Sequence, residues 1–253
     1  MPRIMMILEY EGTRYAGWQR QKNGVSVQQV VEDALFSLTG ERVTVHASGR
    51  TDSSVHALGQ VAHFDTKMRM SPDKFAFALN TFLPKDVRVL HSREVHDGFH
   101  ARFDARAKLY RYDIHNAPHA SAIHRNTRLH VYRPLNIGAM REAAAMVTGT
   151  HDFAAFQAAG SAVRSTVRTV TRSVILQEDE LVSYEIMGNG FLYNMVRIIT
   201  GTLLEIGMNR RPPQAMQDAL NGRMRTLAGP TAPPHGLTLV KVFYDGPAGE
   251  NLG

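Results

Sequence analysis

The stretch SGRTDSSVHALGQVAHF, from Ser48 to Phe64, combines a polar turn with an apolar strand. Its first half places Arg50 and Asp52 on either side of one threonine, so both side chains can lie on one side of an extended turn. Its second half alternates over residues 61–64 with the period of a β-strand. The turn therefore joins two predicted core strands, which give a catalytic or binding loop rigid support.

Strand and helix patterns continue outward from this stretch in both directions. The ranges with strand patterns are 4–10, 43–46, 61–64, 87–95, 108–114, 167–176, 181–187 and 237–244. The ranges with helix patterns are 26–39, 71–84, 137–147, 191–207 and 214–220. Strands and helices that alternate without regular βαβ spacing favour an α+β fold over a Rossmann fold. Two halves of similar pattern join near residue 105, which predicts subdomains at 1–104 and 105–253.

Two of the predicted helices carry terminal signals. Ser26 and Gln29 form a capping box, and Gly40 stands where a helix C-cap is expected. Ser71 is the expected N-cap of the helix in 71–84, and Phe82 is expected on its buried stripe with residues 75, 78 and 79. These signals predict where both helices begin and end.

The composition limits the class of protein. The chain has 253 residues, a net charge of +6 and no cysteine. The lack of cysteine excludes disulfides, cysteine-ligated zinc and a cysteine nucleophile, and we expect a cytoplasmic protein. No apolar run approaches the roughly 20 residues that a membrane span needs. The positive charge favours an anionic partner, and the candidates for a positive surface are Arg14, Arg20, Arg50, Arg164 and Arg168.

Three residues could carry chemistry. Asp52 could simply close a turn through its side chain, but it is the only acid in a turn between core strands. Tyr110 alternates with Tyr112 on a predicted strand, as expected for half-buried cross-strand pairs or for a ring that stacks on a base. Arg197 lies off the apolar stripe of its helix, where an arginine reaches solvent or pairs with an acid.

A metal site is the alternative suggested by the histidines. His96 and His100 are four residues apart, a spacing that chelates metal on a helix. Gly98 and the strand-like neighbours argue against a helix there. We therefore expect no metal at this pair.

Four stretches together resemble the bacterial TruA-type tRNA pseudouridine synthases. They are EYEGTRYAGWQRQ, the opening stretch, NGFLYNMVRIITGTLLEIG and AGPTAPPHGLTLVKV. They occur in the family's order and span nearly the whole chain. The resemblance implies an enzyme that isomerises uridine to pseudouridine at positions 38 to 40 of the tRNA anticodon stem-loop. It also implies a homodimer without metal or cofactor, with a mainly antiparallel sheet and packed helices in each half and an RNA-binding cleft between the halves.

The resemblance also implies roles for individual residues. Asp52 matches the catalytic aspartate, and Tyr110 matches the tyrosine that packs on the target base. Arg197 matches the basic residue that pairs with the aspartate, and Arg50 matches an arginine that helps to flip the nucleotide. Leu237 matches an apolar pocket residue.

The sequence departs from the family pattern at three positions. Ser53 and Ser54 replace the usual Ala-Gly after the aspartate, and Thr238 stands where an aromatic is common. If the family's glycine needs a positive φ, Ser54 costs about 1 kcal/mol or reshapes the turn.

The expected chemistry fits these residues. A carboxylate can act as nucleophile or stabilise cationic charge on a sugar, as in glycosidases. Two other functions stay open from the sequence. One is a basic RNA-binding module in which Arg50 and Asp52 only pair with each other, and the other is a carboxylate hydrolase acting on nucleosides.

Overall fold

The computed structural model describes residues 1–160 and 163–245, which form two compact units. The first unit consists of Met1–Arg106 and the chain from Thr238 onward, and the second of Ala107–Leu237. The sequence-based division at 104/105 lies close to the first boundary, but it assigned the last strand to the second half. Residues 246–253 of that expected second subdomain lie outside the described residues.

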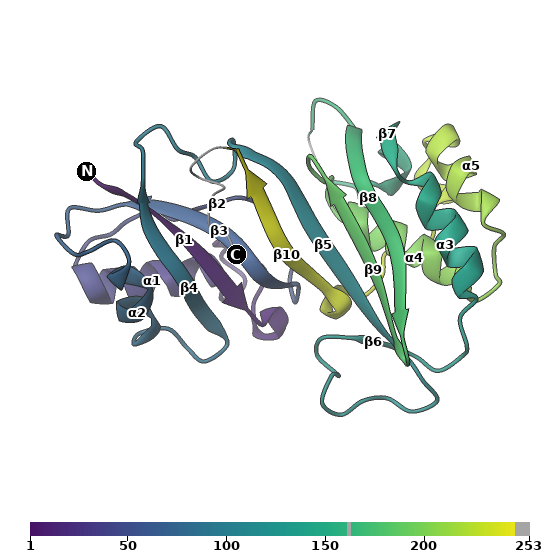
Figure 1. Cartoon of the computed structure of the whole chain (residues 1–253), viewed down its shortest axis with the longest axis horizontal. Helices are drawn as coiled ribbons and strands as arrows, with labels where there is room; N and C mark the ends of the chain where they lie inside the picture. Colours follow the sequence, from purple (N-terminus) through teal and green to yellow (C-terminus); the bar gives the residue numbers. More distant parts are fainter. Residues whose placement is uncertain (161–162, 246–253) are drawn as a thin grey trace. The chain divides into compact units, whose positions relative to one another are not determined.

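The first unit is a sheet with two helices (Figure 1). Its strands are β1 (Arg3–Tyr10), β2 (His46–Ala47), β3 (His56–Asp65), β4 (Val87–Val95) and β10 (Leu237–Tyr244). Its α-helices are α1 (Val27–Thr39) and α2 (Lys74–Asn80), and a short 3-10 helix spans Gly12–Arg14. The strand order is β4-β1-β3-β10, with β2 also on β3; β10 is parallel to β3, whereas β1 is antiparallel to β3 and β4, and β2 is antiparallel to β3. Helix α2 packs on β4 and contacts α1.

The second unit combines mainly antiparallel strands with three helices. Its strands are β5 (Ala105–Asn116), β6 (Leu129–Val131), β7 (Gly149–Asp152), β8 (Val167–Glu178) and β9 (Leu181–Gly188). Its α-helices are α3 (Ile137–Met146), α4 (Met195–Gly207) and α5 (Gln214–Gly222), with 3-10 helices at Ala154–Phe156, Arg225–Leu227 and Pro234–Gly236. The order β5-β9-β8-β7 is antiparallel throughout, and β6 is parallel to β5.

Aromatic and aliphatic side chains fill the core of each unit. In the first unit the rings of Phe64 and Phe75 meet edge to face at 5.6 Å and are fully buried. In the second unit the hydroxyl of buried Tyr184 bonds to Ser173 Oγ at 2.9 Å. The α+β fold with mainly antiparallel strands is thus confirmed. No helix of the described residues is long and apolar enough to cross a membrane.

Most predicted elements are present, and several ends differ. Helix α1 is confirmed with its caps, because Ser26 Oγ accepts from Gln29 N and Gly40 is left-handed. Helix α4 begins at Met195, because Asn194 at its N-cap takes a left-handed φ of 59°. The expected strand at 43–46 is only the two-residue β2.

Helix α2 departs most from its sequence pattern. It begins at Lys74 rather than at the position that a Ser71 N-cap would require, and Asp73 takes the N-cap position. The side chains of Ser71 and Asp73 hydrogen-bond to each other. Phe82 is 49% exposed, so its predicted burial is wrong: the helix ends at Asn80, before the turn that would bring Phe82 onto the buried stripe.

Candidate active site

The Asp52 turn connects β2 to β3 and is closed by hydrogen bonds at both ends. Val55 N donates to Asp52 O at 3.2 Å. Ser48 Oγ donates to Gln60 Oε1 at 2.6 Å, and Gln60 Nε2 donates to Gly49 O at 2.9 Å. Since Gln60 and Ser48 are fully buried, the start of the turn is anchored to β3.

The residue before the aspartate is held through its side chain and its backbone. The hydroxyls of Tyr10 and Thr51 lie 2.8 Å apart, and both residues are buried. Trp18 N donates to Thr51 O at 3.1 Å. These bonds position the peptide that leads into Asp52.

The loop that follows β1 packs directly on the turn. Gly17 has a φ of 89°, and a Cβ there would lie 2.5 Å from the Thr51 carbonyl oxygen. Tyr15 O accepts hydrogen bonds from Ser53 Oγ and Ser54 N, both at 3.2 Å. The loop therefore supports the residues on both sides of Asp52.

Ser54 has a φ of 63°, the left-handed backbone that favours glycine. The conditional expectation that this position needs a positive φ is confirmed. The serine does not open the turn, because Ser54 N and its neighbour Val55 N both keep their backbone partners.

The two charged residues of the turn differ in exposure. Arg50 is exposed, whereas Asp52 is half-buried. Asp52 is the only acid between Ser48 and Phe64. A half-buried carboxylate on an anchored turn has a defined position and remains open to a substrate.

Tyr110 lies on β5 in the second unit. It is 8% exposed, and its ring meets the ring of Phe191 edge to face at 5.2 Å with an interplanar angle of 88°. This contact restricts the ring orientation, which a platform for a base requires.

Arg197 lies in the first turn of α4, and its guanidinium is fixed by two hydrogen bonds. Nε donates to Ala232 O at 2.8 Å, and Nη1 donates to Asn194 Oδ1 at 2.8 Å. Ala232 N in turn donates to the Arg197 carbonyl at 3.0 Å. The side chain therefore connects α4 to the segment that precedes β10.

That segment also packs on Tyr112. The hydroxyl of Tyr112 donates to Pro233 O at 2.8 Å, and a Cβ at Gly236 would lie 2.6 Å from the ring. Burial raises the pKa of Tyr112 and the charge of Arg197 opposes this shift, and the two side chains bond to the adjacent carbonyls of Pro233 and Ala232. Leu237, at the end of the segment, is 5% exposed. The second unit thus gathers Tyr112, Arg197 and the residues leading to Leu237.

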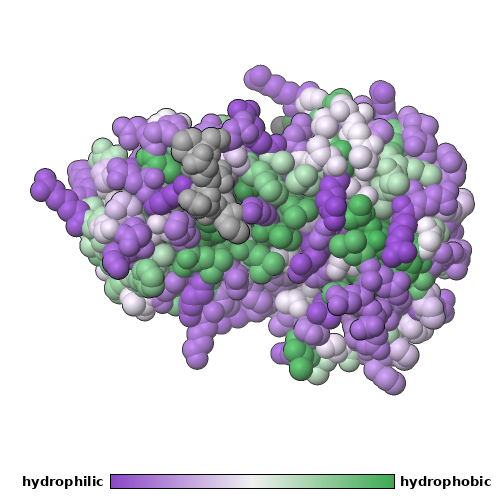
Figure 2. Space-filling model, viewed as in Figure 1, coloured by the Kyte–Doolittle hydropathy of each residue, from purple (hydrophilic) through white to green (hydrophobic). Residues whose placement is uncertain are grey.

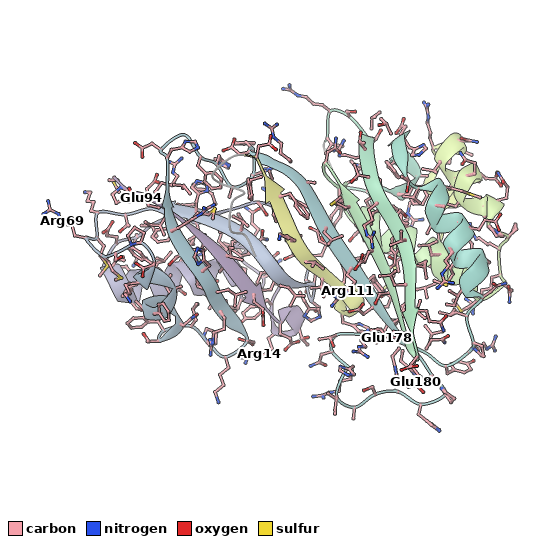
Figure 3. The ribbon with its side chains drawn as sticks, viewed as in Figure 1. Arg14, Arg69, Glu94, Arg111, Glu178 and Glu180 are labelled. Carbon is pink, nitrogen blue, oxygen red and sulfur yellow. The ribbon has the colours of Figure 1, made fainter. Side chains whose placement is uncertain are left out.

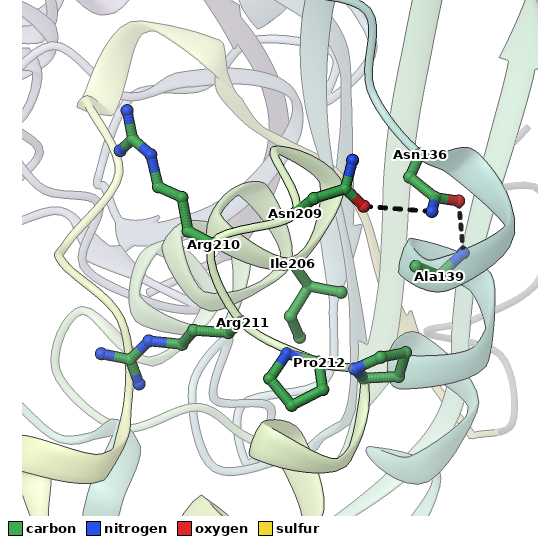
Figure 4. Close-up of a pocket in the computed structure, with 8 residues that line it drawn as sticks. Asn136, Ala139, Ile206, Asn209, Arg210, Arg211 and Pro212 are labelled. Carbon is green, nitrogen blue, oxygen red and sulfur yellow. Dashed lines mark hydrogen bonds between the residues drawn. The ribbon is translucent and has the colours of Figure 1, made fainter.

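A cavity of about 280 Å³ lies elsewhere in the second unit, where α4 leads into α5 (Figure 4). Asn136 connects its walls, because Nδ2 donates to Asn209 Oδ1 at 3.2 Å and Oδ1 accepts from Ala139 N at 3.0 Å. Arg211 forms an ion pair with Glu205 at 2.7 Å. None of the predicted site residues lines this cavity.

The two histidines of the candidate metal pair have different ring neighbours. The rings of His46, His63 and His100 cluster, with centroids 4.8 to 5.6 Å apart, and His96 contacts Phe99 instead. Within residues 1–160 and 163–245, no three His, Asp or Glu side chains are placed to hold a metal ion.

Sequence reasoning missed the supporting residues of the turn. Tyr10 reads as one more apolar residue of a strand, and Gln60 as a polar position in another. Gly17 was the only available signal, since a glycine before the chain's single tryptophan can mark a close backbone approach. Tyr10 and Gly17 act on the turn from distant points in the chain, whereas Gln60 acts from the strand at the end of the same stretch.

The chain forms two α+β units with mainly antiparallel strands, of which the first carries an anchored carboxylate turn and the second a fixed guanidinium. This architecture is consistent with the pseudouridine synthase fold. The family model described as tRNA pseudouridine synthase matches residues 6–104 and 143–245. The chain belongs to the tRNA pseudouridine synthase family, whose enzymes are isomerases. Residues 105–142 lie between the matched ranges.

Curated relatives match over almost the whole chain. The tRNA pseudouridine synthase A of Ruminiclostridium cellulolyticum is 50% identical over 245 residues, which cover 96% of this chain and 100% of the relative. That of Acetivibrio thermocellus is 46% identical, with 96% and 100% covered. That of Myxococcus xanthus is 45% identical, with 100% and 96% covered.

Proposed function

We propose that this enzyme isomerises uridine to pseudouridine at positions 38 to 40 of the tRNA anticodon stem-loop, with Asp52 as its catalytic residue. The observation that carries the proposal is the half-buried carboxylate of Asp52 on a turn that Tyr10, Gln60 and the loop around Gly17 anchor. Family membership and tRNA-modifying relatives support the substrate class.

The reaction needs a carboxylate and no external reactant. The bond between C1′ and the base nitrogen breaks, the base rotates, and C1′ bonds to C5, which then loses its proton while the freed base nitrogen gains one. No atom is oxidised or reduced overall. Asp52 supplies the negative charge that acts as nucleophile or stabilises the cationic sugar.

The remaining site residues act on the uridine and its backbone. Tyr110, restrained by Phe191, packs on the extruded base, and Leu237 contributes an apolar wall. Arg197 provides a nearly permanent positive charge for the carboxylate, because a guanidinium stays protonated. Arg50 is exposed and contacts the RNA phosphates while Asp52 contacts the base.

We further propose that the enzyme works as a cytoplasmic homodimer. The support is the resemblance to a homodimeric family and a tRNA substrate, together with a chain free of cysteine. Sedimentation equilibrium measures the assembly directly, and a monomeric mass at micromolar concentration contradicts this part of the proposal.

The variant Asp52→Asn tests the catalytic assignment. The change keeps the shape of the side chain and removes its charge, so we expect less than a few per cent of wild-type turnover with folding and tRNA affinity nearly intact. The measurement is tritium release from tRNA labelled at uridine C5, with Asp33→Asn on the exposed face of α1 as the matched control. An Asp52→Asn enzyme with substantial turnover excludes Asp52 as the catalytic group.

The same assay separates the two other candidate functions. A nucleoside hydrolase releases free uracil, which chromatography of the wild-type reaction detects. A binding module without catalysis binds tRNA and releases no tritium. We expect tritium release without free uracil.

A further inference from the structure

The connection between β5 and β6, residues 117–128, and the strand end that follows it carry an unusual excess of positive charge. Residues 114–141 contain no aspartate or glutamate. Within them Arg125 and Arg133 are exposed and Arg128 is half-buried. The family model matches the chain only outside residues 105–142, so this segment is not part of the matched pattern.

The side-chain hydrogen bonds of this group of three arginines go to uncharged oxygen atoms. Arg125 Nη1 donates to Ala122 O at 2.6 Å, and Arg133 Nε donates to the Tyr132 hydroxyl at 3.0 Å. In the described part of the chain, none of the three forms an ion pair. By contrast, Arg14 and Arg20, which the sequence suggested for the positive surface, pair with Asp86 and Glu32.

An exposed aromatic ring accompanies this charge. Tyr132 is 61% exposed, and the Arg133 guanidinium lies 5.5 Å from its ring centroid. Such a ring can stack on a nucleobase while the neighbouring guanidinium contacts a phosphate. The surface over this connection is mainly hydrophilic with a small hydrophobic projection (Figure 2), and Ile123 is 84% exposed.

The connection is held in place at its base. Asn116 Nδ2 donates to Val131 O at 2.8 Å and to Arg133 O at 2.7 Å, and Asn116 Oδ1 accepts from Leu135 N at 3.1 Å. His130 Nε2 lies 2.8 Å from Ala117 O. The base of the connection is therefore already ordered, so the connection loses little further conformational entropy when a ligand binds.

An acidic hairpin end borders this surface on one side. Glu178 and Glu180 lie at the turn between β8 and β9 (Figure 3). Glu180 lies 3.9 Å from His115 at the base of the connection. These acids limit the positive surface to the part of the connection that carries the three arginines.

We propose that this surface is a second RNA contact of the enzyme, in which Arg125, Arg128 and Arg133 bind phosphates of the tRNA and Tyr132 stacks on a nucleobase. The inference rests on the proposed function, because it assumes a tRNA substrate. A second copy of the chain fits less well, since a two-fold contact through this surface brings like charges together.

A triple variant, R125Q/R128Q/R133Q, tests the phosphate contacts. Each charged side chain, none of them buried, is replaced by a neutral polar side chain, so we expect the fold to be retained. We expect the dissociation constant for full-length tRNA to rise by about 10- to 100-fold at 0.15 M salt. The slope of log affinity against log salt should become less steep by about 2 to 3. Binding is measured in an Asp52→Asn background, which leaves the tRNA unmodified during equilibration.

The matched control removes three positive charges from the first unit. The variant K67Q/R69Q/K85Q changes the net charge equally, and Arg69 extends into solvent after β3 (Figure 3). We expect less than a threefold change in tRNA affinity. Equal losses in the two triple variants overturn the proposal, because net charge alone then explains the binding. An unchanged affinity in the R125Q/R128Q/R133Q variant overturns it as well.

Tyr132 provides an independent test of the stacking contact. Tyr132→Phe keeps the ring, and we expect less than a threefold loss of tRNA affinity, whereas Tyr132→Ala loses about tenfold. Equal affinities of the Phe and Ala variants contradict stacking. Sedimentation of the same variants without tRNA tests whether a second copy of the chain binds this surface instead. If the R125Q/R128Q/R133Q variant dissociates where the wild-type assembly does not, the surface is a protein interface and the proposed RNA contact is wrong.

The proposed function and this inference fail separately. If Asp52→Asn retains turnover, the catalytic assignment is wrong, whatever the arginines do. If tritium release is normal and the arginine and tyrosine variants bind tRNA like wild type, only the second contact is wrong.

Discussion

Ser54 occupies a backbone conformation that glycine adopts without steric strain. Its φ of 63° brings the serine Cβ close to the following carbonyl, which costs about 1 kcal/mol. We expect Ser54→Gly to raise the free energy of unfolding by about 0.5 kcal/mol, because relief of strain is partly offset by the greater freedom of the unfolded chain. Urea denaturation measures this change.

The neighbouring residue is the matched control. Ser53 is not among the residues with positive φ, and its Oγ donates to Tyr15 O at 3.2 Å. Ser53→Gly therefore loses a hydrogen bond and gains no relief, and we expect a loss of about 1 kcal/mol. If both glycine variants lose stability equally, Ser54 is not strained.

At Arg197 the geometry of the side chain matters as well as its charge. Lysine keeps the charge but cannot donate to Ala232 O and Asn194 Oδ1 from the two sides of a planar group. We expect Arg197→Lys to lower turnover by at least tenfold while tRNA affinity changes less than threefold. Single-turnover kinetics and filter binding separate the two effects.

A lysine variant of Arg225 tests whether Arg197 acts in catalysis or only supports the segment before β10. Its Nη1 donates to Gly229 O at 2.8 Å, so it anchors the chain that Arg197 also holds. Arg225→Lys should leave turnover within threefold of wild type. Equal losses in the two lysine variants show that Arg197 acts only by holding the segment.

At the scale of one element, strand β3 buries a histidine within a cluster. His63 is 2% exposed, and its Nδ1 accepts from Ala101 N at 3.2 Å. Burial, helped by the charges of His100, Arg3 and His46, lowers its pKa from 6.5 to about 4, and Asp65 opposes this shift. The cluster therefore favours the neutral ring in the folded state.

This shift predicts a loss of stability in acid. Above pH 6.5 the ring is neutral in both states, and as pH falls toward 4 only the unfolded state takes up the proton. The folded state then loses about 3 kcal/mol by pH 4. His63→Asn keeps an acceptor for Ala101 N, and we expect its unfolding free energy to fall less between pH 7 and pH 4.5 than that of wild type.

Exposed His91 on β4 supplies the comparison for this titration. His91→Asn should follow the wild-type pH dependence, because it leaves the cluster of His46, His63 and His100 intact. If the unfolding free energy of His63→Asn depends on pH as that of wild type does, groups other than His63 cause the loss of stability in acid.

Element boundaries show where sequence patterns succeed and fail. Helix α1 follows its pattern because Ser26, Gln29 and Gly40 are local signals that the backbone obeys. Helices α2 and α4 do not begin where their patterns suggest, because neighbouring side chains and a left-handed Asn194 decide their first turns. The sequence therefore predicts helix ends that depend on local capping residues, but not those that depend on tertiary packing.

At the scale of the whole molecule, the α+β class and the Asp52 turn could be predicted from the sequence. The turn combines residues that lie close together in the chain. Its supports could not be predicted, because Tyr10, Gly17 and Gln60 reach it from a strand, a loop and the far side of the turn. The grouping of the last strand with the first unit has the same cause, because β10 pairs with β3, a strand far from it in the sequence.

The net charge of +6 predicts how tRNA binding depends on salt. Each phosphate contacted by an arginine or lysine releases condensed counterions, so log affinity falls linearly with log salt by about 0.7 to 0.9 per contact. We expect a slope of about −3 or steeper between 50 and 300 mM KCl, measured by filter binding with the Asp52→Asn enzyme. Wild-type and Asp52→Asn slopes should agree, because Asp52 meets the base rather than a phosphate. A slope near zero removes the electrostatic role of the basic surface and with it the phosphate contacts proposed for Arg50 and for the connection between β5 and β6.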